Sequence, residues 1–155
     1  MLIGLISDTH GLLRPAVHEA LAGVELILHA GDVGDQDILD ELALIAPVHA
    51  VLGNTDDPFG LHLPRAIDLV LGGLKVHVSH GHELGRPQPE RVAAAYVADV
   101  CIYGHTHIQK IERVGHQLIV NPGAAGARRF NLMPSVARLT IRDGLAEAIL
   151  VDLPV

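Results

Sequence analysis

Side chains that bind divalent cations follow five apolar segments of this chain. Each segment has the length and the aliphatic character of a strand, and each leads into a residue with an oxygen or nitrogen donor. Seven donors follow these segments: Asp8, His10, Asp32, Asn54, His80, His105 and His107. The strands of an open α/β sheet deliver their carboxyl ends to one edge, where ligands gather. Since an octahedral ion uses only six ligands, seven donors at one edge predict two neighbouring ions.

The spacing within the motifs suits metal binding. In Asp8-Thr9-His10 a carboxylate and an imidazole stand two positions apart, so both can turn toward one ion from an extended loop. His105 and His107 have the same spacing and suit two adjacent ions, with one nitrogen for each. Asp32 is the expected bridge, because a carboxylate can share its oxygens between two hard cations.

Asn54 is the least typical of the seven donors. Its amide oxygen can bind a cation while its amino group donates to a phosphate oxygen, so we also expect a catalytic role for it. The alternative is that Asn54 only tolerates a left-handed turn beside Gly53. Each motif alone has such a structural explanation, as a turn, a helix cap or a pair of ordinary loop histidines. Five motifs in order, all at strand ends, together favour a metal site.

Other reactive side chains are expected to support the ligands or to pack. His29, just before Gly31-Asp32, is interpreted as an outer partner of the ligands or a core residue. His82 is interpreted as structural or solvent-facing. Cys101 lies in an apolar strand and is expected to be a small buried hydrophobe rather than a nucleophile.

The donors need a scaffold that brings the strand ends together. At the start of the chain two helix-like segments alternate with three strand-like ones, which predicts a parallel sheet with right-handed crossovers. The rest predicts antiparallel hairpins that turn at Gly72-Gly73, Gly115 and Asp143-Gly144. Strands are expected at 2–7, 25–30, 48–52, 65–71, 74–79, 99–103, 108–114, 117–120, 135–142 and 145–152, and helices at 15–22, 36–45 and 89–97. We therefore predict an α/β fold, a four-layer sandwich of two mixed β-sheets flanked by helices, in a single domain over residues 1–155.

Composition limits the classes of partner. The 155 residues carry a formal net charge of −7, and only 3% of them are aromatic. Such a chain is poorly suited to bulk nucleic-acid binding, which depends on Lys and Arg. No apolar stretch approaches the roughly 18 residues that span a bilayer, and no leader pattern precedes the first strand, so we expect a cytoplasmic protein with no membrane partner. A small phosphorylated molecule remains open as a substrate, and so does assembly into a homo-oligomer.

The motifs also carry a family resemblance. Asp-x-His, Gly-Asp, Gly-Asn, His and Gly-His-x-His, in this order from Asp8 to His107, resemble the pattern of the calcineurin-like metallophosphoesterases. The short length, Gly53-Asn54-Thr55-Asp56 and Asn121-Pro122-Gly123 look most like the small YfcE-like phosphodiesterase branch. The resemblance implies the metallo-dependent phosphatase fold, in which two β-sheets are flanked by helices.

The resemblance implies a role for each donor and an activity. One ion would be held by Asp8, His10 and His107, the other by Asn54, His80 and His105, with Asp32 bridging the two. The ions would be two divalent cations, Mn²⁺ by preference, with Fe, Zn²⁺ or Ni²⁺ as alternatives. The implied activity is metal-dependent hydrolysis of small phosphodiesters or activated phosphomonoesters by a hydroxide that bridges the metals.

One position departs from the family pattern. Most members have His after Gly-Asn, and that His is thought to protonate the leaving group or to steady the phosphate. Here the position is Thr55, whose hydroxyl is not a general acid near neutral pH. The small branch is similar in lacking this His, so we expect the fold and the metals to be kept and substrates with poor leaving groups to react less efficiently. Asp56 matches the acidic residue of the motif and is expected to fix the loop.

Two other functions share parts of this pattern. A non-catalytic protein-interaction scaffold of the same fold, like the retromer subunit, can lose ligands without penalty, whereas all seven donors are present here. A metal-dependent amidohydrolase also uses a His-x-His pair, but its barrel needs roughly 250 residues.

Arg128 and Arg129 are interpreted as solvated surface residues, and 83–89 as a rim over the site or an ordinary surface loop.

Overall fold

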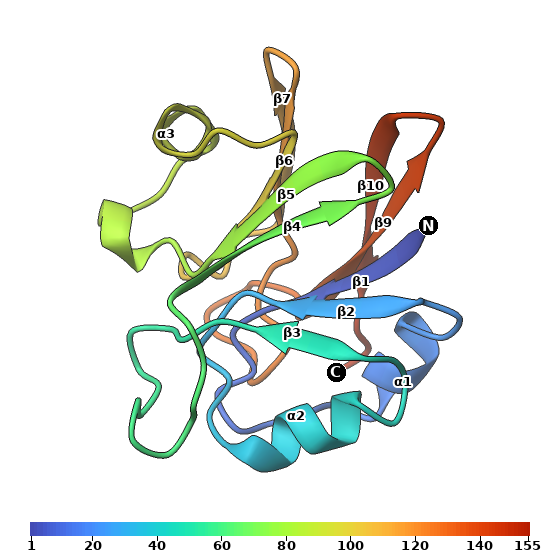
Figure 1. Ribbon diagram of the computed structural model, residues 1–155. Coiled ribbons are helices and arrows are strands. Elements are labelled where there is room, and N and C mark those ends of the chain that lie inside the picture. The colour runs from blue at the N-terminus through green and yellow to red at the C-terminus, as the bar shows by residue number, and fades with distance from the viewer.

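Two mixed β-sheets of five strands each make up the protein, whose computed structural model describes residues 1–155 (Figure 1). The strands are β1 (Leu2–Ile6), β2 (Leu26–His29), β3 (Val48–Ala50), β4 (Ala66–Leu71), β5 (Leu74–Ser79), β6 (Val100–Ile102), β7 (Lys110–Val114), β8 (Gln117–Asn121), β9 (Ser135–Arg142) and β10 (Leu145–Asp152). The first sheet has the order β10-β9-β1-β2-β3, and the second has β4-β5-β6-β8-β7. In the first sheet β1, β2 and β3 run parallel, and in the second β5, β6 and β8 do.

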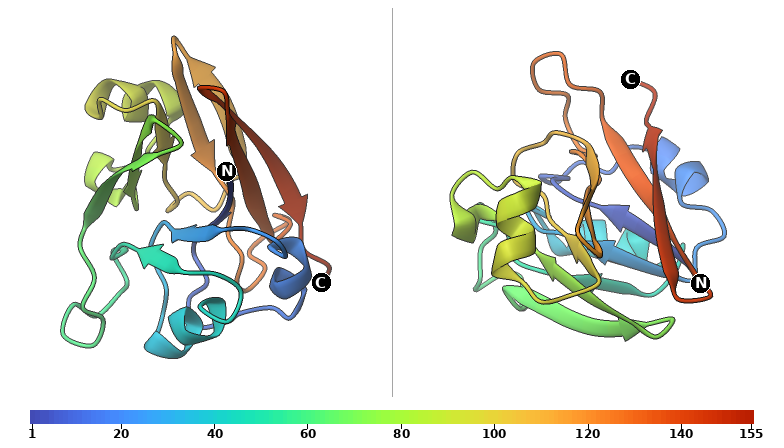
Figure 2. Two further views of the ribbon diagram at one scale, coloured as in Figure 1. Left: turned by 45° about the vertical axis from the view of Figure 1, so that its right-hand side comes forward. Right: turned by 90° about the horizontal axis from the view of Figure 1, so that it is seen from above.

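Helices cover the outer face of each sheet, so the predicted four layers are confirmed (Figure 2). Helices α1 (Ala16–Ala20) and α2 (Gln36–Leu42) pack on the first sheet, where Val17 and Leu42 join one buried cluster with Ile27 of β2. Helix α3 (Pro89–Ala95) packs on the second sheet through Val92, in a cluster with Ile119 of β8. A short 3₁₀ turn, η1 (His82–Leu84), follows β5.

Apolar side chains from both sheets fill the space between them. In β1, Ile3 and Leu5 belong to this central cluster, whereas Ile6 belongs to the cluster under the helices. A strand buried on both faces reads as a continuous apolar run rather than an alternating one. Gly4 lets α1 come close, because a Cβ at this position would lie 3.1 Å from Leu21.

The predicted turns are confirmed, and the predicted helices are too long. The Gly72-Gly73 and Asp143-Gly144 turns both have positive φ, as tight hairpins require. Helix α2 ends at Leu42, since the amide of Ile45 turns back to the Leu42 carbonyl at 2.9 Å in a tighter turn. Asp35 occupies the N-cap position of α2, but its side chain makes no capping hydrogen bond.

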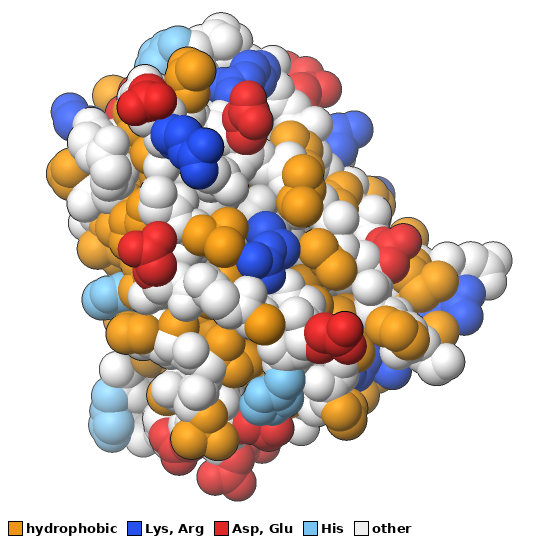
Figure 3. Space-filling model, turned by 90° about the vertical axis from the view of Figure 1, so that its right-hand side faces the viewer, with side chains coloured by type: hydrophobic (Ala, Val, Ile, Leu, Met, Phe, Trp, Pro, Cys, Tyr) orange, Lys and Arg blue, Asp and Glu red, His pale blue; other side chains and the backbone are white.

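Charged side chains of both signs lie on the surface, as the composition predicts. On the face that Figure 3 shows, acidic, basic and apolar side chains are interspersed, with no broad basic patch. None of the helices combines the length and the apolar character needed to cross a bilayer.

Candidate metal centre

The predicted donors lie in the loops that follow strands of both sheets. Asp8, His10 and Asp32 follow β1 and β2 of the first sheet, whereas His80 and His107 follow β5 and β6 of the second. The expectation that one sheet edge carries every donor is therefore incomplete. The two sheets face each other, and their carboxyl ends meet at the same end of the sandwich.

Two groups of donor atoms converge there. In the first group the Nε2 atom of His107 lies 3.2 Å from Asp8 Oδ1, and the Nε2 atoms of His10 and His107 are 3.4 Å apart. In the second group His80 Nε2 lies 3.2 Å from Asp32 Oδ2 and 3.8 Å from Asp8 Oδ1. Ligands at right angles around an ion, each about 2.1 Å from it, are about 3 Å apart, so both groups have the dimensions of a metal site.

Both carboxylates extend from one group to the other. Asp32 Oδ2 lies 3.6 Å from His10 of the first group and 3.2 Å from His80 of the second. Asp8 belongs to both groups. This arrangement supports a carboxylate shared between two ions, and it makes Asp8 a second candidate beside Asp32.

His80 offers a buried lone pair with no partner in the protein. Its Nδ1 atom lies 2.7 Å from the carbonyl oxygen of Ala30, so Nδ1–H donates there and Nε2 is left unprotonated in the neutral ring. His80 Nε2 and Asp8 Oδ1 are both buried and make no hydrogen bond. Unpaired buried polar atoms are costly, and a cation between them removes that cost. A divalent ion therefore fits the residues present.

The loops that carry the donors adopt strained backbone conformations. Five of the seven predicted ligands, which are Asp8, His10, Asp32, His105 and His107, have positive φ values between 48° and 70°. Non-glycine residues rarely adopt this left-handed region, and such strain concentrates at functional sites. Each motif thus turns its side chain sharply back toward the strand ends.

Glycines next to the ligands make room for the carboxylates. A Cβ at Gly53 would lie 2.0 Å from Asp32 Oδ1, and one at Gly104 would lie 2.6 Å from Asp8 Oδ2. A side chain at Gly53 or Gly104 would therefore collide with a carboxylate of the centre. Glycine at these two positions lets the loops of Asn54 and His105 pass close to Asp32 and Asp8.

His105 and Asn54 are placed less tightly than the other donors. The His105 ring stands edge-on to His80 with centroids 5.2 Å apart, and its backbone amide donates to Asp8 Oδ2 at 3.1 Å. Asn54 is exposed, and its side chain makes no hydrogen bond within the protein. The amide of the next residue, Thr55, donates to Asp32 Oδ1 at 2.9 Å, which keeps the Asn54 loop beside the centre.

Several supporting residues escaped the sequence analysis. Ser7 donates to Asp8 Oδ2 at 2.7 Å, although its place before Asp8 gives no such signal. The Asn121 side chain donates to the Gly104 carbonyl and to Thr106 Oγ1, at 3.1 and 3.0 Å, and so holds the loop of His105 and His107. The role expected for Asp56 is confirmed, because it accepts from three backbone amides, those of Val33, Gly34 and Gly53.

His29 is confirmed as a buried outer partner of the ligand loops. Its Nδ1 accepts from the Gly31 amide at 3.1 Å, and its Nε2 lies 3.0 Å from Thr9 Oγ1, which itself donates to the Val33 carbonyl. Burial lowers the pKa of His29 to about 4, so the ring is neutral at neutral pH. It ties the loop after β1 to the loop after β2.

The ionisation of the centre favours cations. Burial alone would raise the pKa of Asp8 and Asp32, but the neighbouring imidazoles outweigh it. The pKa of Asp8 falls far below its usual range, and that of Asp32 falls to about 2. Burial opposes the charged form of His80, yet Asp32 and Asp8 raise its pKa overall, whereas burial and the charge of His80 lower the pKa of His105.

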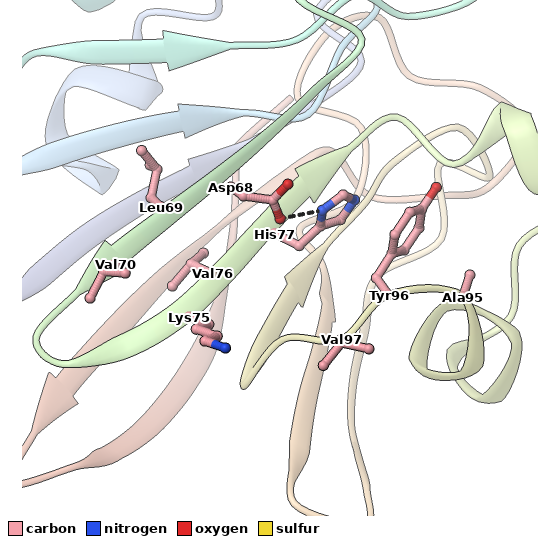
Figure 4. Close-up of a pocket in the computed structure, with 9 residues that line it drawn as sticks. All are labelled: Asp68, Leu69, Val70, Lys75, Val76, His77, Ala95, Tyr96 and Val97. Carbon is pink, nitrogen blue, oxygen red and sulfur yellow. Dashed lines mark hydrogen bonds and ion pairs between the residues drawn. The ribbon is translucent and has the colours of Figure 1, made fainter.

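One hollow of the protein is away from this centre. It has a volume of about 560 Å³ and lies between β4, β5 and the segment after α3 (Figure 4). There His77 Nδ1 lies 2.8 Å from Asp68 Oδ1, and the Tyr96 ring stacks on the imidazole with centroids 3.8 Å apart. None of the seven donors lines it. A smaller hollow of about 460 Å³ does touch the centre, through His105.

Comparison with known proteins agrees with this geometry. A family model for the calcineurin-like phosphoesterase superfamily domain matches residues 1–144. The chain belongs to this superfamily. A protein of Methanothermobacter thermautotrophicus named probable metallophosphoesterase is 38% identical over 148 residues, which cover 90% of this chain and 81% of that protein.

Two further similarities bear on function. The phosphodiesterase YfcE of Escherichia coli is 32% identical over 76% of either chain, and its solved structure superposes with a TM-score of 0.69, covering 90% of this chain and 88% of that one at 25% identity. Vps29 of Entamoeba histolytica, solved in complex with Zn²⁺, superposes with a TM-score of 0.79 at 26% identity and covers 98% of this chain and 99% of that one. The fold predicted from the sequence is thereby confirmed.

Proposed function

We propose that this protein is a phosphodiesterase that binds two divalent metal ions and acts on small phosphorylated molecules. The observation that carries the proposal is the buried, unpartnered pair of atoms His80 Nε2 and Asp8 Oδ1, enclosed by His10, Asp32 and His107. Membership of the phosphoesterase superfamily and the likeness to the E. coli phosphodiesterase support it.

We assign each donor to one of two ions. Asp8, His10 and His107 would hold the first ion, Asn54, His80 and His105 would hold the second, and Asp32 would be shared between them. Mn²⁺ is the proposed ion, and Fe, Zn²⁺ and Ni²⁺ are the alternatives, since nitrogen and oxygen donors accept all of them. When bound, such ions supply Lewis acidity and make water reactive near neutral pH.

The protein groups position the reactants. The exposed Asn54 amide has no partner in the protein, so its N–H₂ is free to donate to a phosphoryl oxygen and stabilise the charge that develops there. The Asp56 carboxylate holds the Asn54 loop through its three amide contacts. Ser7 is buried and bonded to Asp8, and Cys101 is fully buried in another cluster, so neither is placed to attack a substrate.

The proposal is tested with bis(p-nitrophenyl) phosphate. The Mn²⁺-loaded protein is expected to release nitrophenol, and both a chelator and the Asp32→Asn substitution should lower the rate at least about 100-fold, because the shared carboxylate is lost. Arg142→Gln, on the exposed end of β9, is the matched surface control and should keep the full rate. Full activity in the Asp32→Asn protein would refute the assignment.

The likeness to Vps29 keeps one alternative in view, a protein-interaction scaffold of the same fold. The two functions differ in what the ions are needed for. If the protein is a scaffold, it will bind two ions per chain and hydrolyse no member of a panel of phosphomonoesters and phosphodiesters. If it is a phosphodiesterase, it will hydrolyse at least one phosphodiester of that panel. The unpaired Asn54 amide beside the centre favours catalysis, because a purely structural site needs no free donor.

A further inference from the structure

The hollow beside His105 extends the centre beyond the metal ligands. It is lined by residues from three surface segments, 85–88, 105–108 and 130–132, and has a volume of about 460 Å³. His105 is part of its wall and also part of the proposed metal site. A phosphate held at the centre thus has this hollow as its immediate neighbour, with room for the group esterified to it.

One wall of the hollow is apolar and aromatic. Phe130 is one of only two phenylalanines in the chain, and it is 92% exposed. Its φ is +53°, a conformation that bulky side chains rarely adopt. Ile108, which is 53% exposed, and Leu132 continue this wall. An aromatic ring held in solvent at the edge of a hollow has one face free for stacking.

Arg86 adds a positive charge to this hollow. It lines the same hollow and makes no ion pair or hydrogen bond within the protein. The chain has 18 acidic residues, yet none of them lines this hollow, whereas Asp68 lines the larger one. Arg86 therefore offers an unpaired positive charge to a ligand in this hollow.

We propose that this hollow binds the ester group of the substrate, and that this group is a flat aromatic ring bearing a negative charge. The inference rests on the proposed function, since it places the phosphate at the metal centre. Phe130 stacks on the ring, and Arg86 pairs with the negative charge. His105 lies between this ring and the phosphate at the metal centre.

The test uses phosphonates, whose P–C bond is not hydrolysed, with the Mn²⁺-loaded protein in a calorimeter. Phenylphosphonate is expected to bind about 3- to 10-fold more tightly than methylphosphonate, the gain of an aromatic contact. Phe130→Ala should reduce this preference to within about 2-fold. Adding a 4-carboxylate to phenylphosphonate should improve affinity about 2- to 5-fold, and Arg86→Gln should remove that gain.

Two exposed residues away from the hollow provide matched controls. Leu44→Ala removes another exposed apolar side chain, and Arg142→Gln removes another exposed arginine. Both variants should keep the wild-type preferences. Equal affinity for phenylphosphonate and methylphosphonate, absent phosphonate binding, or an undiminished preference in Phe130→Ala would overturn the inference.

Hydrolysis of bis(p-nitrophenyl) phosphate separates this inference from the proposed function. Hydrolysis without the ring and charge preferences overturns the inference alone. Both preferences without hydrolysis support the hollow as a ligand site and refute the phosphodiesterase.

Discussion

At the scale of single residues, two buried histidines are fixed in opposite roles by their hydrogen bonds. His80 donates through Nδ1 to the Ala30 carbonyl and keeps a lone pair on Nε2 for a cation. His29 accepts through Nδ1 from the Gly31 amide and has its Nε2 satisfied by Thr9, so it has no atom left for a metal. Residue type alone does not separate a ligand from a support. The direction of the hydrogen bond at Nδ1 does, because a ring that donates from Nδ1 keeps a lone pair on Nε2, whereas a neutral ring that accepts at Nδ1 is protonated on Nε2.

The lowered pKa of His29 predicts a loss of stability in mild acid. Its folded pKa of about 4 lies below the ordinary 6.5, so between these values the unfolded chain binds a proton that the folded protein does not. The free energy of unfolding should fall by up to about 3 kcal/mol as the pH drops from 6.5 to 4, and then level off for this group. Urea unfolding of the chelated protein at a series of pH values measures it.

A matched variant isolates His29 from the other histidines. The raised pKa of His80 acts with the opposite sign, and the lowered pKa of His105 with the same sign, so the total slope mixes several groups. In His29→Gln the amide can still donate to Thr9 but does not titrate. The difference between wild type and variant should therefore carry the predicted slope, and parallel curves would contradict the assignment.

At the scale of elements, the predicted donors lie in the loops after the strands, and the strands determine where those loops begin. The loop after β6 is held by the Asn121 side chain at the end of β8, through Gly104 and Thr106. His105 and His107 both depend on that loop, and both have positive φ. A strained loop needs such an external tie to stay in one conformation.

Asn121→Ala tests this tie. The variant should bind Mn²⁺ about 10- to 100-fold more weakly and lose activity in proportion, because the ligands are no longer oriented. Saturating Mn²⁺ should restore part of the rate. Gln109→Ala, which removes an exposed hydrogen bond to Asp152, is the control and should leave Mn²⁺ affinity unchanged. Equal Mn²⁺ affinity in the two variants would show that Asn121 does not orient the site.

The elements also show what a sequence can and cannot predict. The donors were predictable because each follows an apolar strand, and ligands gather at the carboxyl ends of parallel strands. Their division between two facing sheets was not predicted. Long-range supports were not predictable, since Asn121 holds a loop about 15 residues away, a spacing that has no local signal. The role of Asp56 in its own loop was predicted from the motif, but its contacts with amides more than 20 residues away were not. Helix ends were overestimated for a related reason: tight turns such as that at Ile45 continue the apolar periodicity beyond the helix.

At the scale of the whole molecule, the centre lies where loops of the two sheets meet. Predicted donors that follow β1 and β2 meet predicted donors that follow β5 and β6, while the chain as a whole carries a charge of −7. Without ions, ionised Asp8 and Asp32 repel each other inside the protein, partly compensated by His80. A bound cation removes this repulsion and links the sheets, so metal binding and folding are coupled.

This coupling predicts a metal-dependent melting temperature. An ion that binds only the folded protein stabilises it by about 2.7 kcal/mol at a concentration 100 times its Kd, and a chain of this size gains roughly 2–4 °C per kcal/mol. Mn²⁺ should therefore raise the melting temperature by about 5–10 °C per site over the chelated protein. In Asp8→Asn, which belongs to both donor groups, most of the shift should disappear, while Gln109→Ala should keep it. Because the neighbouring imidazoles hold the pKa of Asp8 far below its usual range, ionised Asp8 stabilises the fold, and the neutral variant should melt below wild type when both are free of metal. The Mn²⁺ shift is therefore measured within each protein, against its own chelated form. A full Mn²⁺ shift in Asp8→Asn would mean that the ions bind elsewhere, and the two-sheet centre would not be the metal site.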